Sequence, residues 1–204
     1  MRFEDRKLIL ASASPRRREL MEKLGVPFEI EVSSAEEVIP PDLPVSRTAE
    51  YLSGLKAGDV FQKHSGESVT VIGSDTVVIL EGEIFGKPRD REDAYRMLKR
   101  LSGRTHIVST GVTILSGTPG KGGAVTKSFT SEAKVTFYEL TEEEIREYLT
   151  KGEYADKAGA YGIQGLGALF VEKVEGDYYT VVGFPLAAAA RLPKQEIKED
   201  GGQS

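Results

Sequence analysis

The chain has 204 residues, of which 39% are hydrophobic, and its formal net charge is −5. This length can bury a substantial core, so residues 1–193 are expected to form a single domain, followed by a polar, disordered tail over 194–204. The acidic balance excludes a chain-wide positive field for long nucleic acids, and an anionic ligand must therefore be small and met by a local cluster of lysines and arginines. Cysteine is absent, and the first residues form neither a signal-peptide core nor a membrane span, so a cytoplasmic protein is expected.

In the first half of the chain, strands and helices are expected to alternate. Apolar runs or alternating apolar residues predict strands at 8–11, 28–32, 69–80 and 83–85. Apolar residues that recur on one face predict helices that begin at Pro15, near Arg47 and after Asp90, and that end before Gly25, near Lys63 and at Leu101. An acidic loop over 33–44 connects the second strand to the second helix.

In the second half, two strands at 105–115 and 128–138 are expected to flank a loop rich in glycine and lysine at 116–127. Thr141 and Glu144 form a predicted capping box for a further helix. After a glycine-rich stretch, a hairpin is predicted from strands at 169–174 and 178–182. Several of these connections are too short for a parallel crossover, so the expected fold is α/β, with a mixed, twisted β-sheet flanked by helices.

The segment from Ser12 to Arg18 predicts an anion-binding helix N-terminus. Ser14 suits the cap and Pro15 the first helical position, which leaves free backbone N–H groups beside Ser12 and three arginines. Cations in a first helical turn oppose the helix dipole, so they cost stability unless an anion compensates them. The alternative is a solvated arginine run on a surface helix.

Asp75 lies within the apolar run 71–79 and is the strongest candidate for a catalytic carboxylate. A buried, unpaired charge is expensive, so it needs a metal ion, a set of hydrogen-bond donors or a raised pKa. Groups of this kind cluster at active sites. The alternative is a turn between two shorter strands, in which the carboxylate bonds to local backbone.

Weaker candidates lie elsewhere in the chain. Either carboxylate of Glu36-Glu37 could help Asp75 to hold Mg²⁺ or Mn²⁺, which prefer oxygen ligands. Lys87 can reach a phosphate as a point charge, although the glycine spacing before it does not form a Walker A motif. The amide of Gln164 can both donate and accept, which suits the N3–H and O2 edge of uracil or thymine.

Five segments, in this order and spacing, resemble the Maf family. They are ASASPRR at 11–17, GSDT at 73–76, GKP at 86–88, LSGRTH at 101–106 and KAGAYGIQG at 157–165. Five matched segments in order are far more specific than any one of them. The helix around Lys56 departs from the family pattern, because the family usually has charged residues before this lysine.

The resemblance implies a fold of the Maf/inosine triphosphatase type. It also implies a metal-dependent pyrophosphatase, in which water cleaves a nucleoside triphosphate between its α- and β-phosphates. Asp75 matches the proton acceptor, and with Glu37 it is the expected pair of metal ligands. Residues that match polar positions around the phosphates are Ser12, Arg17, Lys56 and Lys87. Residues at the positions that discriminate between bases are Arg16, Thr76 and Gln164, and family members with this set act on dTTP and UTP.

Two further expectations follow from the resemblance and the composition. The family implies a homodimer and a small-molecule nucleotide ligand. The main competing hypothesis is a nucleotide sensor without catalytic activity that regulates a partner in cell division. An RNA-binding protein is disfavoured by the acidic balance and by the lack of an aromatic stacking stripe.

Overall fold

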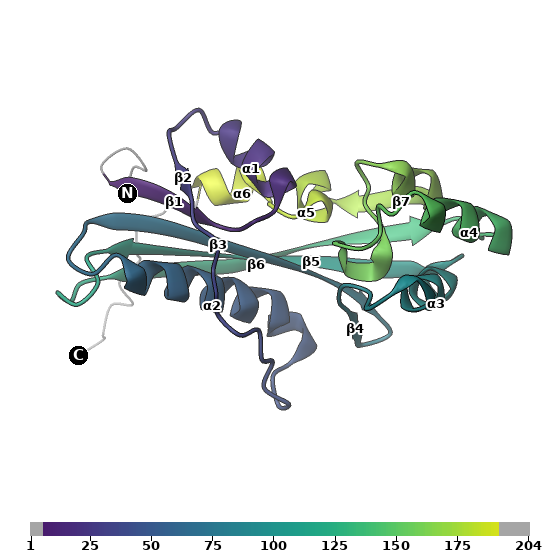
Figure 1. The fold of residues 1–204 in the computed structure, drawn as a ribbon, viewed down its shortest axis with the longest axis horizontal. Helices are drawn as coiled ribbons and strands as arrows, with labels where there is room; N and C mark the ends of the chain where they lie inside the picture. Colours follow the sequence, from purple (N-terminus) through teal and green to yellow (C-terminus); the bar gives the residue numbers. More distant parts are fainter. Residues whose placement is uncertain (1–5, 192–204) are drawn as a thin grey trace, which may run out of the picture.

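The computed structural model describes residues 6–191, which form one seven-stranded sheet with helices on both faces (Figure 1). The strands are β1 (Lys7–Ala11), β2 (Glu29–Ile30), β3 (Val69–Leu80), β4 (Glu83–Phe85), β5 (Thr105–Gly117), β6 (Val125–Phe137) and β7 (Val171–Gly176). Their order is β2-β1-β3-β5-β6-β7, and β4 pairs with β3. β1 is parallel to β2 and β3, whereas the other pairs are antiparallel. The prediction of a mixed sheet in an α/β fold is therefore confirmed.

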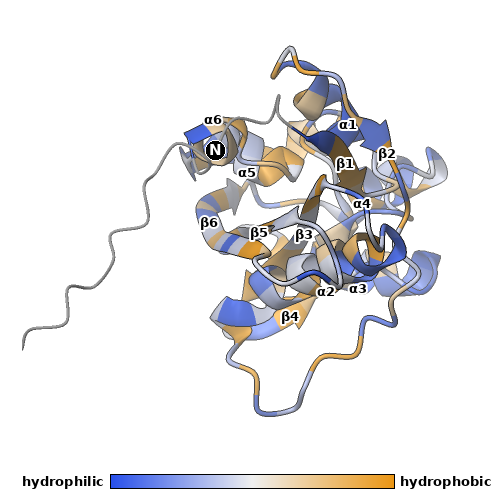
Figure 2. Ribbon diagram, turned by 90° about the vertical axis from the view of Figure 1, so that its left-hand side faces the viewer, coloured by the Kyte–Doolittle hydropathy of each residue, from blue (hydrophilic) through white to orange (hydrophobic). Residues whose placement is uncertain are grey.

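Within the described residues 6–191, six α-helices cover this sheet. They are α1 (Pro15–Glu22), α2 (Thr48–Lys63), α3 (Arg91–Leu101), α4 (Glu142–Thr150), α5 (Tyr178–Val182) and α6 (Leu186–Arg191). Figure 1 shows α1, α5 and α6 on one face of the sheet and α2 on the other. In Figure 2, the ribbon of α1 is mainly hydrophilic, whereas the adjacent β1 is hydrophobic. No helix within residues 6–191 is long and apolar enough to cross a membrane.

Helix α2 packs directly on β3 and β5 because two glycines face it. A Cβ at Gly73 would lie 2.2 Å from the carbonyl oxygen of Ser53, and a Cβ at Gly111 would lie 2.2 Å from the backbone of Ala49. Neither position can carry a side chain at this spacing. The glycines therefore set how closely the helix, and the side chains that it carries, approach β3.

Local capping signals in the sequence were sufficient to place two helices. Asp90 accepts a hydrogen bond from the backbone N–H of Asp93 at the start of α3. Thr141 and Glu144 form the complete capping box of α4. Each cap satisfies backbone donors that have no partner within the helix. These predictions are confirmed.

The predicted C-terminal hairpin is wrong in its second strand, because residues Tyr178–Val182 form helix α5. The aromatic and β-branched composition of this segment is typical of a strand. In the structure, Asp177 accepts from the backbone N–H of Tyr179 at one end, and Gly183 ends the helix with a φ of 117° at the other. Tertiary contacts hold the helix as well, because the carbonyl oxygen of Thr180 accepts from Thr110.

Two other boundaries differ from the prediction. The expected loop at 116–127 is shorter, because Ser116 pairs with Val125 and extends the β5–β6 ladder into it. The expected strand at 28–32 is reduced to Glu29–Ile30, the part that pairs with β1. The expected disordered tail at 194–204 lies outside the described residues.

Candidate active site

The candidate site lies where the sheet is open on one side of β3. On that side, β1 pairs with β3 as far as Gly73, and β4 pairs with it from Val78 onward. Between them, the described strands leave the edge from Ser74 to Val77 without a neighbour. Successive side chains of a strand point to opposite faces, so Asp75 and Thr76 leave β3 in opposite directions. Because the edge is open, both reach the same space.

This space is a cavity of about 580 Å³. Of the two glutamates offered as metal ligands, Glu37 lines it and Glu36 does not. The other site residues named from the family resemblance all line it as well: Ser12, Arg16, Arg17, Lys56, Asp75, Thr76, Lys87 and Gln164. They come from the β1–α1 connection, the acidic loop, α2, β3, the segment after β4 and the glycine-rich segment. The structure therefore brings together residues that are spread over most of the chain.

The cavity carries a positive balance within an acidic protein. Five cationic and three acidic side chains line it, whereas the whole chain has a net charge of −5. The cations are Arg16, Arg17, Lys56, Lys87 and Lys157, and the acids are Glu37, Asp75 and Asp156. Such a local cluster attracts a small polyanion that the remaining surface repels.

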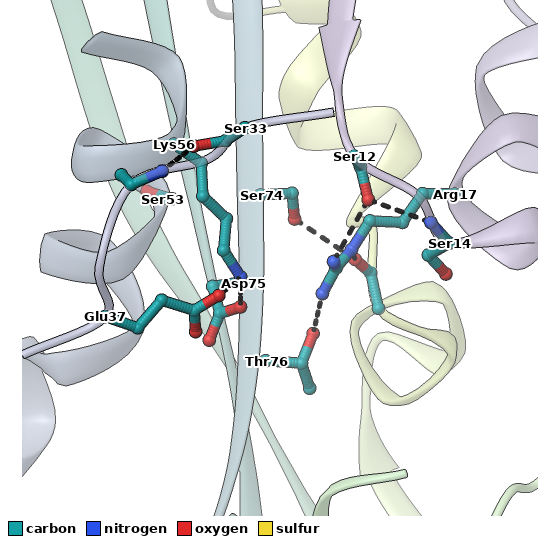
Figure 3. A network of polar contacts seen from close by, with 12 residues as sticks. Ser12, Ser14, Arg17, Ser33, Glu37, Ser53, Lys56, Ser74, Asp75 and Thr76 are labelled. Atoms are coloured by element: carbon teal, nitrogen blue, oxygen red, sulfur yellow. Dashed lines mark hydrogen bonds and ion pairs between the residues drawn. The ribbon is translucent and has the colours of Figure 1, made fainter. Parts of the chain in front are cut away.

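On one face of β3, two carboxylates converge on a lysine (Figure 3). Asp75 is a buried residue of the continuous strand β3 and is 9% exposed, so the alternative of a turn between two short strands is wrong. Lys56 of α2 donates a hydrogen bond to Asp75 and forms an ion pair of 3.1 Å with Glu37. The side chain of Lys56 is only 15% exposed. The ammonium group thus holds together the two acids predicted to bind a metal.

Glu37 is carried by the acidic loop, whose first part is attached to α2. Asp59 accepts hydrogen bonds from Lys63 and from the backbone N–H of Ser34. These bonds, first that of Lys63, lower the pKa of Asp59 to about 2. His64 bonds to Glu31 at 2.8 Å, and this bond is the main cause of its raised pKa. These contacts fix the loop before it reaches the cavity.

On the other face of β3, Arg17 is held by three oxygens. It donates to the carbonyl oxygen of Gly183 at 2.9 Å, to Thr76 at 3.0 Å and to Ser12 at 3.3 Å. Burial lowers the pKa of Arg17, and the negative charge of Asp75 acts against this shift. A guanidinium remains charged in proteins, so Arg17 presents a fixed positive charge to the cavity. Figure 3 shows this group across β3 from Asp75.

Thr76 therefore has a contact that the sequence did not reveal. Its hydroxyl accepts from Arg17 and lies 2.9 Å from the hydroxyl of Thr110, which is itself bonded to the carbonyl oxygen of Thr180. Thr110 is fully buried. This chain of hydrogen-bonded hydroxyl groups, from Thr110 to Thr76, orients the guanidinium of Arg17.

Arg16 points to a different partner from Arg17, as expected for neighbours on a helix. It forms an ion pair of 3.2 Å with Asp156, at the start of the glycine-rich segment that carries Gln164. Burial opposes ionisation of Asp156, but bonds from Lys157 and Arg16 outweigh it, so its pKa lies below its ordinary value. Asp156 and Lys157 were not assigned a role from the sequence. Lys157 is the first residue of the matched KAGAYGIQG segment and Asp156 directly precedes it, and this position was the only signal.

The arrangement of the two acids fits a divalent cation whose remaining ligands come from a substrate. No group of three or more histidine, cysteine or acidic side chains within residues 6–191 could hold a metal alone. Asp75 and Glu37 nevertheless meet at one cation, the ammonium of Lys56. Mg²⁺ is commonly held by one or two carboxylates together with substrate phosphates. The donor set therefore fits such an ion.

The fold and the cavity define the class: an α/β protein with a pocket, lined by more cationic than acidic side chains, at the open edge of a mixed sheet. The chain belongs to the Maf-like protein family, whose profile matches residues 7–196. It is 47% identical over 190 residues to a dTTP/UTP pyrophosphatase from Bacillus cereus, which covers 93% of this chain and 95% of that protein. It is 51% identical over 181 residues to a dTTP/UTP pyrophosphatase from Thermotoga maritima, with coverages of 88% and 84%.

Proposed function

We propose that this protein is a nucleoside triphosphate pyrophosphatase that hydrolyses dTTP and UTP to the monophosphate and pyrophosphate. Modified pyrimidine nucleotides form a second candidate class of substrate. Similar proteins over nearly the whole chain bear the name dTTP/UTP pyrophosphatase. The observation that carries the proposal is that Asp75 and the cation cluster line one cavity. The proposal treats residues 1–193 as one catalytic domain and places the enzyme in the cytoplasm as a homodimer.

The proposed chemistry is hydrolysis by direct attack of water. Asp75 orients a water molecule toward the α-phosphorus and accepts its proton, while the bond from the α-phosphorus to the bridging oxygen breaks and pyrophosphate leaves. Ser12, Arg17, Lys56 and Lys87 bind the phosphates and stabilise the charge that develops on them. Asp75 and Glu37 would hold a divalent cation, and such an ion would supply neutralisation of the phosphate charge.

Base selection is assigned to Arg16 and Gln164, which line the same cavity. Arg16 donates to the O4 carbonyl of uracil or thymine, and Gln164 pairs with the N3 edge. Cytosine has an amino group in place of O4, which would face another donor. Mismatched buried polar groups are costly, so this arrangement rejects it. Thr76 acts on the ligand through Arg17, which it holds by a hydrogen bond of 3.0 Å.

The test is release of pyrophosphate from a panel of triphosphates, with Mg²⁺ and Mn²⁺ compared. We expect turnover of dTTP and UTP, and a loss of at least about 100-fold in kcat in Asp75→Asn, because the proton acceptor is removed. Near-normal turnover by a folded Asp75→Asn protein would refute the assignment. Arg16→Ala and Gln164→Ala should reduce the preference for UTP over CTP without changing the metal requirement.

The competing hypothesis, a nucleotide sensor without catalytic activity, makes a different prediction in the same assay. It requires saturable binding of a triphosphate with no pyrophosphate after prolonged incubation with metal. The position of Asp75 beside the phosphate-binding cations favours the enzyme, because a sensor has no need for a carboxylate where negative phosphates bind.

A further inference from the structure

Two elements that are distant in the sequence meet beside Arg16, in the lining of the cavity. Arg16 lies in the first turn of α1, and Asp156 begins the segment that leads to Gln164. Their side chains form an ion pair of 3.2 Å, in which the Arg16 side chain is 27% exposed and that of Asp156 is 59% exposed. This pair links the two residues assigned to base selection.

Asp156 is in turn part of a braced segment. Lys157 donates to the carboxylate of Asp156 at 2.6 Å and to the carbonyl oxygen of Glu153 at 2.7 Å. The stem of Lys157 lies against Gly162, where an added Cβ would come within 2.5 Å of its Cε. The carboxylate of Glu153 accepts from the backbone N–H of Leu166 at 2.9 Å. The two ends of the segment around Gln164 are thus tied together, and Arg16 is attached to this frame through Asp156.

We propose that Asp156 is a positioning residue for base selection, which holds the guanidinium of Arg16 in register with Gln164. This inference rests on the proposed function. The bond engages one terminal nitrogen of the Arg16 guanidinium. The other N–H groups of the guanidinium therefore stay available to a carbonyl oxygen of the base. Loss of the bond leaves Arg16 present but free to rotate, and it then donates to the base less often in the correct geometry.

The exposure of the pair separates this role from a structural one. Exposed ion pairs contribute little to folding stability because solvent screens the charges. Removal of the carboxylate should therefore change base preference and leave the thermal midpoint nearly unchanged. A residue that only supports the fold would show the opposite pattern.

The experiment compares Asp156→Asn, which keeps the size of the side chain, with the matched control Glu142→Gln. Glu142 forms an ion pair with Lys99 in which both side chains are at least 60% exposed, and neither residue lines the cavity. We expect Asp156→Asn to lower the ratio of kcat/KM for UTP over CTP by about three- to tenfold. A decrease of this size corresponds to partial loss of the hydrogen bond from Arg16 to the base. Asp156→Glu should restore part of the ratio, and Glu142→Gln should leave it unchanged.

A double-mutant cycle completes the test. In the background of Arg16→Ala, Asp156→Asn should have no further effect on the ratio, because the residue through which it acts is gone. An unchanged or increased ratio in Asp156→Asn alone, or an equal effect in both backgrounds, would overturn the inference. The ratio of the dissociation constants for non-hydrolysable analogues of CTP and UTP is measured as well. This ratio reports base preference in binding, independently of turnover.

The two proposals fail in different ways. Wild-type protein that binds the UTP analogue selectively but releases no pyrophosphate refutes the enzymatic proposal, while the binding ratio still decides the role of Asp156. Turnover with a preference for UTP that Asp156→Asn leaves intact refutes the inference alone. A wild-type protein without base preference in both assays refutes both.

Discussion

Replacing Gly73 by alanine should move Lys56, which α2 carries, away from Asp75, which β3 carries. The added Cβ would lie 2.2 Å from the carbonyl oxygen of Ser53 and 2.9 Å from the Cβ of Ala57, both on α2. Real Cβ atoms do not approach backbone this closely, so either α2 or β3 must move. Lys56 lies between these two residues on α2, and its bond to Asp75 is therefore displaced with the helix.

The expected loss of folding stability in Gly73→Ala follows from the cost of overpacking. An extra methyl group in a packed core typically costs about 1–3 kcal/mol. In a domain of this size, each kcal/mol lowers the midpoint of thermal unfolding by about 2–4 °C, so a decrease of about 2–12 °C is expected. A displacement of a catalytic group by about 1 Å can cost about 100-fold in rate, and kcat should fall more than stability alone explains.

The assay is thermal unfolding together with steady-state release of pyrophosphate, and Gly58→Ala is the matched control. Gly58 lies on the same helix, but an added Cβ there would meet nothing within 4 Å. Alanine is the better helix former, so this variant should gain about 0.5–1 kcal/mol and keep its activity. If Gly73→Ala kept both the wild-type midpoint and the wild-type kcat, the argument from close packing would be wrong.

Three further predictions concern the groups around the acidic loop. Lys56→Met removes the cation between two carboxylates, so Mn²⁺ should bind the nucleotide-free protein more tightly in calorimetry, while turnover falls. The raised pKa of His64 means that its bond to Glu31 stabilises the fold below about pH 6.5 and that this contribution is lost as the pH rises through the folded-state pKa. Urea unfolding should therefore show a larger difference between wild type and His64→Gln at pH 6 than at pH 9, and an equal difference would contradict the assignment. The pKa of Asp59 is lowered to about 2, so its contribution is present above about pH 4 and is lost as the pH falls toward 2. The destabilisation by Asp59→Asn should accordingly be present at pH 6 and be much smaller at pH 2.

Predictions from sequence succeeded where a signal acts over a few residues. The caps at Asp90 and Thr141 fix helix starts because each side chain bonds to the backbone three positions further along the chain. Strands at 69–80 and 83–85 were predicted from their apolar runs, and in the structure they pair as a hairpin whose turn residues, Glu81 and Gly82, both have positive φ angles. The prediction of a strand at 178–182 was wrong because the composition of this segment favours a strand, whereas its contact with Thr110 and its position between Asp177 and Gly183 favour a helix.

The sequence by itself determined the mixed sheet, the capped helices and, through the resemblance to the Maf family, nine of the residues that line the cavity, because periodicity, caps and motif spacing are local properties of the chain. The tertiary structure alone decided how these residues meet. Asp75 and Thr76 leave β3 on opposite faces, yet both line one cavity, because β1 ends before them and β4 begins after them. The pairing of Arg16 with Asp156 joins positions 140 residues apart. No pattern in the intervening residues encodes such a contact, since it depends on how α1 and the glycine-rich segment pack around the open edge of the sheet.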